Sequence, residues 1–185
     1  AMYFIGDGWI TLGFTAGFLT TGLITKDERT LTVANQLFQG LLLTGVTTQI
    51  IKRTTGRESP IQSTKPGGRW KPFPSFHEYS EKTSRYDAFP SGHLATTMTT
   101  FMILSENYPE YHWIKPVGYT LMSLLSFQMV NNSVHWAGDY PLALGIGYML
   151  GKTIVENGRK KVGDNNEKSE VSFIPFILPT GQVGM

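Results

Sequence analysis

The sequence contains no cysteine, which excludes disulfide bonds, thiol catalysis and cysteine-ligated zinc. Charge is also scarce: 16% of the 185 residues are Asp, Glu, Lys or Arg, against about 25% in an ordinary soluble protein. The net charge of +2 is small and scattered, so the chain lacks the basic stripe that nucleic-acid binding favours. A hydrophobic content of 41% argues against disorder, and the length fits a single domain.

Long stretches of the chain carry no Asp, Glu, Lys or Arg at all. They are residues 8–25, 30–51, 88–105 and 116–138, with a shorter stretch at 140–151. A membrane-spanning helix needs about 20 predominantly apolar residues. Gln and Thr side chains interrupt the second stretch, and a soluble helical bundle gives a similar pattern. The composition therefore favours a membrane protein and leaves a soluble bundle open.

The sequence predicts an all-α bundle of five to six helices. The five main helices are expected over residues 9–25, 31–52, 92–107, 116–132 and 139–156. The connection 53–91 is rich in Pro, Gly and charge, and its aromatic residues argue against disorder. We expect one domain over 1–158, in which 53–91 is a functional loop, and a polar C-terminal tail over 159–185. The tail contains a β-prone apolar run at 171–178.

One face of the predicted helix 92–107 is polar. Its members recur at the spacing i, i+3, i+4 and i+7 and are His93, Thr96, Thr97 and Thr100. A polar face in a bundle or membrane helix usually lies toward neighbouring helices or a cavity.

The first of three polar clusters is residues 89–93, FPSGH. Ser91 is a good N-cap for the predicted helix, so the amides of Gly92 and His93 point outward. These amides and the helix dipole attract an anion, and the glycine lets a ligand approach the backbone. The alternative is a helix start whose histidine is incidental.

The second cluster is residues 135–139, HWAGD. The Asp139 carboxylate can accept a hydrogen bond from His135 Nδ1, which would fix the tautomer and leave Nε2 free to act. Because proline is tolerated only in the first helical turn, Pro141 predicts a helix start near Gly138 or Asp139. A buried histidine satisfied by an aspartate is the alternative.

The third cluster is basic and follows the predicted helix 31–52; it is residues 52–60, KRTTGRESP. Taken alone, it reads as the charged flank of an apolar helix. In an antiparallel bundle, however, the second helix ends at Lys52, the third starts at Ser91 and the fourth ends before His135. All three clusters then meet at one end. Two histidines, an oriented carboxylate, open amides and cations indicate a phosphate-ester site.

These motifs resemble those of the type 2 phosphatidic acid phosphatase superfamily, which includes bacterial nonspecific acid phosphatases and vanadium haloperoxidases. The resemblance covers about residues 31–156. The motifs are Lys-x6-Arg-Pro, Pro-Ser-Gly-His and Ser-Arg-x5-His-x3-Asp, and the second is intact in this chain. Both phosphate-binding arginines are missing, because Ser59 and Met129 stand at their positions.

The resemblance implies hydrolysis of a phosphate monoester or pyrophosphate, of a lipid in view of the membrane-length stretches. His135 would be the nucleophile that forms a phosphohistidine, Asp139 would orient it, and His93 would protonate the leaving oxygen. The phosphate would be held by Lys52, Ser91 and Gly92. Arg57 is the candidate to replace a missing arginine. No metal or other cofactor is expected.

Two other functions stay open. A non-catalytic protein that binds or scaffolds a phosphate lipid fits the loss of both arginines. A haloperoxidase would hold vanadate with the same histidine. This function suits a small membrane-like chain poorly. We expect a phosphorylated lipid or small phosphate ester as partner and no nucleic acid.

We expect the protein in the inner (cell) membrane, with the site facing the periplasm or exterior. Basic residues at 159–161, at the end opposite the motifs, favour this orientation. A soluble periplasmic protein is the alternative.

Overall fold

The computed structural model describes residues 8–163, with side chains up to residue 159. Within these residues the chain forms six α-helices: α2 (Gly8–Thr25), α3 (Glu28–Thr55), α4 (Phe76–Glu81), α5 (Gly92–Asn107), α6 (Ile114–Asn131) and α7 (Tyr140–Gly163). The same residues contain no β-strand, only isolated bridges from Arg57 to Trp70 and to Asp87. The predicted all-α fold is therefore confirmed.

The five long helices lie where the sequence predicts them, but α7 extends seven residues beyond its predicted end at 156. Residues 159–163 of the predicted tail therefore continue the last helix. The rest of that tail, including the apolar run 171–178, lies outside the described residues.

The ends of α3 are set by two local features. The Asp27 carboxylate caps its start by accepting hydrogen bonds from the amides of Arg29 and Thr30. Gly56 ends the helix with a left-handed backbone (φ 57°), and its amide donates to the Lys52 carbonyl oxygen. A side chain at Gly56 would collide with the Lys71 carbonyl, so the glycine is needed to turn the chain into the following loop.

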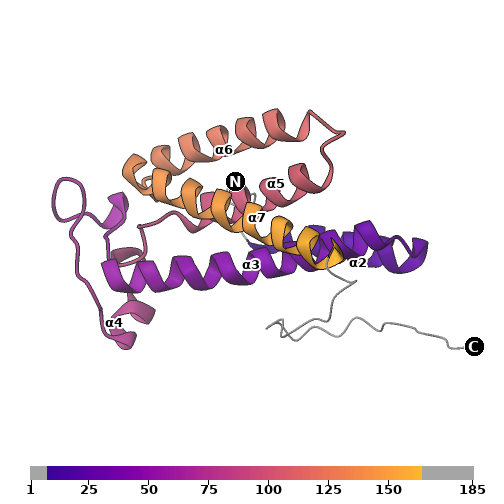
Figure 1. Ribbon diagram of the computed structural model, residues 1–185. Helices are drawn as coiled ribbons and strands as arrows, with labels where there is room; N and C mark the ends of the chain where they lie inside the picture. Colours follow the sequence, from indigo (N-terminus) through magenta and orange to yellow (C-terminus); the bar gives the residue numbers. More distant parts are fainter. Residues whose placement is uncertain (1–7, 164–185) are drawn as a thin grey trace, which may run out of the picture.

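Helix α5 lies at the centre of the bundle and contacts α3, α6 and α7 (Figure 1). Glycines on α7 allow the closest of these approaches: a Cβ on Gly147 would lie 2.5 Å from the Ala95 carbonyl oxygen. The core between α5, α6 and α7 is formed by Leu94, Ala95, Met98, Met102, Met122, Leu125, Met129 and Ala143. This packing fixes the start of α5 beside the end of α6.

The chain crosses the bundle so that α3 and α6 end, and α5 and α7 begin, at the same end. The loop 56–91, which includes α4, lies at that end (Figure 1). A buried carboxylate anchors this loop: Glu58 accepts hydrogen bonds from the Thr64 amide and hydroxyl and from the Arg69 amide. Burial by itself would raise the pKa of Glu58, but these hydrogen bonds outweigh it and keep the pKa below its ordinary value.

Some of the loop aromatics pack as predicted, whereas Phe73 and Phe76 are 77% and 76% exposed. Tyr79 of α4 is buried and lies 6.5 Å from the Tyr86 ring, and the Arg53 guanidinium sits 4.3 Å from the Tyr79 ring centre. These contacts hold α4 against the end of α3.

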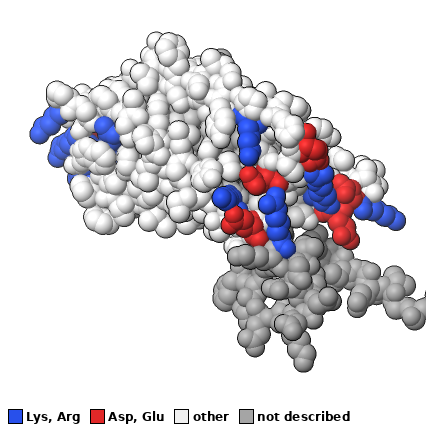
Figure 2. Space-filling model, turned by 45° about the horizontal axis from the view of Figure 1, so that its top comes forward, with Lys and Arg blue, Asp and Glu red and all other residues white. Residues whose placement is uncertain are grey.

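Apolar side chains cover the middle of the molecule. On the face in Figure 2, charged side chains gather toward the two ends, and the surface between them is uncharged. We call the exposed apolar side chains on the charge-free runs of the long helices the apolar band; they include Leu23, Leu42, Val46, Phe127 and Met149. They come from α2, α3, α6 and α7, so the band involves most of the long helices.

One helix within residues 8–163 is long and apolar enough to cross a membrane by length and composition: α2, Gly8–Thr25. Only 17% of it is buried, unlike the core helix of a soluble protein. Because a signal sequence near the N-terminus passes the same test, α2 alone does not place the chain in a membrane.

Candidate active site

The three polar clusters meet at one end of the bundle, as the antiparallel connectivity predicts. The Lys52 ammonium at the end of α3 lies 3.9 Å from where a Cβ on Gly92 would be. The rings of His93 and His135 have their centroids 5.9 Å apart and are inclined by 71°. Residues 40 or more positions apart in the sequence thus form one site.

The start of α5 and Lys52 together form a positive environment. Ser91 is fully buried and caps the helix, its Oγ accepting a hydrogen bond from the Leu94 amide at 3.5 Å. Lys52 is 7% exposed, and its ammonium lies 3.5 Å from Asp87 Oδ2. Because a helix N-terminus carries partial positive charge, a cation beside Gly92 strengthens the attraction for an anion there.

His135 is held by a backbone carbonyl. Its side chain is 3% exposed, and Nδ1 lies 2.7 Å from the Ala88 carbonyl oxygen. Since a carbonyl only accepts, Nδ1 carries the proton and Nε2 is the unprotonated nitrogen of the neutral ring. Asp139 Oδ2 lies 3.5 Å from Nδ1, farther away than the Ala88 carbonyl oxygen. The tautomer is the one predicted, but Ala88 rather than Asp139 makes the closest contact.

Asp139 is instead the centre of a buried ion pair. Its side chain is fully buried; Oδ1 lies 2.5 Å from Arg57 Nη1, and Oδ2 accepts from the Trp136 amide at 2.8 Å. Arg57 also donates through Nε and Nη2 to the Gly67 carbonyl, and its guanidinium lies 4.8 Å from the Trp70 ring centre. Arg57 therefore points at Asp139, and contact with a phosphate stays a prediction.

The two positions where the family has arginine are buried and uncharged. The Ser59 amide and hydroxyl both donate to the Ser84 carbonyl oxygen. Met129 is fully buried, with its sulfur 3.7 Å from Ser91 Oγ. Met129 therefore occupies the site as the motif spacing predicts, but it brings a thioether where the family has a cation.

Several residues that build the site carried no signal in the sequence. The Ala88 carbonyl acts through its backbone, and Asp87 reaches Lys52 only because the loop folds back onto α3. Trp136 binds the loop through its indole, which donates to the Glu58 carbonyl at 2.8 Å. No group of three or more His, Asp or Glu side chains within the described part of the chain is arranged to hold a metal ion.

The fold and site define a class: an all-α protein with two neighbouring histidines beside a lysine and a helix N-terminus. The sequence matches the PAP2 superfamily over residues 34–162, and the chain belongs to that superfamily. The predicted resemblance is therefore confirmed, and members are generally phosphatases that act on phosphate esters. No curated protein and no solved structure matches the chain.

Proposed function

We propose that the protein is a metal-independent phosphatase that hydrolyses a phosphate monoester or pyrophosphate of a lipid through a phosphohistidine intermediate. The observation that carries this proposal is the pairing of His135 with His93 beside Lys52 and the start of α5. One histidine has an unprotonated Nε2, the second is a nearby acid, and the positive environment attracts phosphate.

In the proposed reaction, His135 Nε2 attacks phosphorus and the bond to the leaving oxygen breaks. His93 donates a proton to that oxygen. Water then attacks the phosphohistidine, His93 takes up a proton from it, and phosphate leaves with His135 restored. Lys52 and the amides at the start of α5 stabilise the charge on the phosphoryl oxygens. The Asp139 carboxylate, 3.5 Å from His135 Nδ1, stabilises the positive imidazole ring of the intermediate.

The apolar band supports a lipid substrate and a place in the membrane. α3 has no charged residue between Arg29 and Lys52, and the 22 residues in between correspond to about 33 Å of helix, close to a hydrocarbon core of about 30 Å. On α7 the band is shorter, because Lys152 interrupts it. The Lys152 ammonium lies 3.8 Å from Glu156. Long lysine side chains near a helix end can extend toward the interface between membrane and water.

We place the site on the periplasmic or exterior side of an inner membrane, on the basis of Arg159 and the basic residues after it at the opposite end. The absence of cysteine allows a direct test with single introduced cysteines. Ser80→Cys in α4 should react with a membrane-impermeant maleimide in intact cells. Tyr111→Cys, at the opposite end, should react only after the cells are opened. Equal labelling of both, or a monodisperse protein in buffer without detergent, contradicts the placement.

The phosphatase proposal is tested by phosphate release from the purified chain, screened over lipid and soluble phosphates. Rapid acid-free quenching with a radiolabelled substrate should leave an acid-labile, base-stable label on His135. We expect release from at least one lipid phosphate together with this label. No release and no label from any substrate rejects the proposal.

A non-catalytic phosphate-lipid binding protein is the second candidate, because Ser59 and Met129 stand where the family has arginines. Removing one preorganised donor from such a site costs about 10²–10³ in rate. Binding of a lipid phosphate without any release of phosphate would favour this candidate.

A further inference from the structure

Two threonines on the polar face of α5, Thr97 and Thr100, already donate their hydroxyl protons within the fold. The Thr97 hydroxyl donates to the His93 carbonyl at 2.8 Å, and the Thr100 hydroxyl donates to the Thr96 carbonyl at 2.9 Å. Thr100 also shares a hydrogen bond with Thr11 of α2. Because these hydroxyl protons are donated to helix carbonyls, the two threonines offer a ligand only acceptor lone pairs and methyl groups.

A cavity of about 210 Å³ lies against these threonines. α2, α5 and α6 wall it, with Ile10 and Phe14 from α2, Thr97 and Phe101 from α5, and Leu121 from α6. None of the side chains that line it is charged. We call this cavity the α2–α5–α6 slot.

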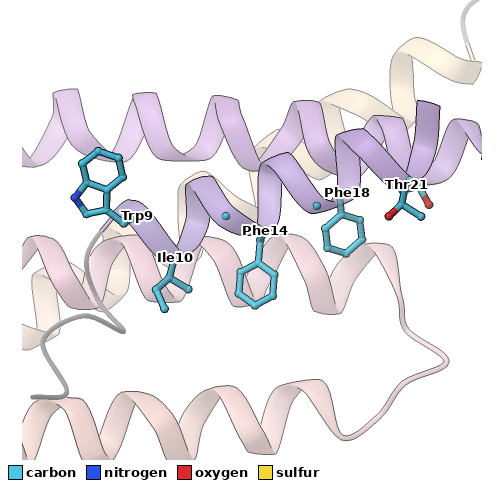
Figure 3. A pocket seen from close by; sticks show the side chains of 8 residues that line it. Trp9, Ile10, Phe14, Phe18 and Thr21 are labelled. Atoms are coloured by element: carbon cyan, nitrogen blue, oxygen red, sulfur yellow. The ribbon is translucent and has the colours of Figure 1, made fainter. Parts of the chain in front are cut away.

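A second apolar hollow adjoins the slot along α2. This groove of about 600 Å³ shares Ile10 and Phe14 with the slot and extends to Trp9 and Phe18. Figure 3 shows Ile10, Phe14 and Phe18 projecting from one side of α2. The groove and the slot therefore adjoin at Ile10 and Phe14, and no charged side chain lines either of them.

The inner part of the slot is close to the candidate active site. Thr97 lies one helical turn after His93, which is about 6 Å along the α5 axis, and its hydroxyl is bonded to the His93 carbonyl. Because residues four positions apart lie on the same face of a helix, His93 and Thr97 share one face of α5, and the slot begins on that face at Thr97.

We propose that the α2–α5–α6 slot binds a single hydrocarbon chain of the lipid phosphate substrate, which enters between α2 and α6. The proposal rests on the proposed function, since it takes the phosphate to lie at His135. The uncharged lining matches a hydrocarbon, and pockets for drug-sized ligands span about 300–1,000 Å³. At about 210 Å³ the slot is smaller than that and has room for one narrow chain.

The first test is photo-crosslinking of the full chain in phosphatidylcholine vesicles. One probe is hexadecyl phosphate with a diazirine in its chain, and the other is hexadecanol with the same diazirine. The phosphate probe should label Thr97, Phe101 or Leu121 about tenfold more than the alcohol probe, a difference of about 1.4 kcal/mol. Equal labelling by both probes means that bulk lipid fills the slot and overturns the proposal. Label confined to outward residues such as Leu124 also overturns it.

The second test fills the slot from α6 with Leu121→Trp. Leu124→Trp is the matched control, because Leu124 is on the same helix and 47% exposed. The ratio of kcat/KM for hexadecyl phosphate to that for p-nitrophenyl phosphate should fall about tenfold in Leu121→Trp and stay unchanged in Leu124→Trp. An unchanged ratio in both variants overturns the slot. If the wild type hydrolyses neither these two substrates nor any other phosphate in the screen, the proposed function fails, while crosslinking still decides the slot.

Discussion

Replacing His135 with alanine is expected to lower phosphate release by about 10⁴-fold or more, the scale seen when a covalent catalyst loses its nucleophile. The side chain is almost completely buried, and its Nδ1 hydrogen bond to Ala88 aims Nε2 as the one unprotonated ring nitrogen. Alanine removes the atom that would accept the phosphoryl group, so the labelled intermediate should disappear as well. Steady-state release and rapid-quench labelling measure both effects.

His77→Ala is the matched control for this experiment. His77 is 82% exposed on α4, where its ring lies 3.3 Å from Glu81. Its removal should leave both release and label at the wild-type level. Wild-type turnover in His135→Ala would show that the buried histidine is not the nucleophile in this protein.

Replacing Arg57 with alanine is expected to destabilise the fold by about 3–5 kcal/mol, the cost of removing one partner of a buried ion pair. Asp139 is fully buried and would be left without its cation, 3.5 Å from His135. The Gly67 carbonyl would also lose both of its guanidinium hydrogen bonds. Chemical denaturation and phosphate release should both show a larger effect than in any other single arginine-to-alanine variant of the loop.

Arg53→Ala and Arg85→Ala are the controls. The Arg53 guanidinium stacks on the Tyr79 ring, and Arg85 is exposed in its short 3-10 helix, so neither variant leaves a carboxylate unpaired inside the protein. Wild-type unfolding and turnover in Arg57→Ala would contradict the importance of the pair.

A double variant separates the two roles considered for Arg57. If Arg57 acts by neutralising Asp139, then Asp139→Asn in the Arg57→Ala background should recover part of the lost stability, because no buried charge remains. If Arg57 instead acts by binding the phosphate, the second substitution should recover nothing. The free energy of unfolding is the appropriate readout, since Asp139→Asn changes the surroundings of His135 and thus the turnover.

Residue order alone specifies the helices and the end of the bundle at which the polar clusters gather. The charge-free runs locate the long helices, and Ser91 caps α5 as predicted. Asp27 and Gly56 set the ends of α3 three residues beyond the predicted range 31–52 on each side. The antiparallel alternation of α3, α5 and α6 then brings Lys52 and His135 to the same end, although a long loop joins α3 to α5. These features depend on spacing along the chain, so the pattern of residues is enough to predict them.

The atoms that the site residues contact depend on tertiary packing. Arg57 reaches Asp139, and the His135 ring bonds the Ala88 carbonyl, through a loop whose folding depends on buried groups such as Glu58. Every residue has a backbone carbonyl, so the residue type does not indicate which carbonyl bonds a site residue. The carboxylate that pairs with an arginine is likewise determined by which one the tertiary packing places near it. The threonines of α5 illustrate the same limit: Thr97 and Thr100 are polar in the sequence, but in the fold their hydroxyls donate to helix carbonyls and they line a slot without charged side chains.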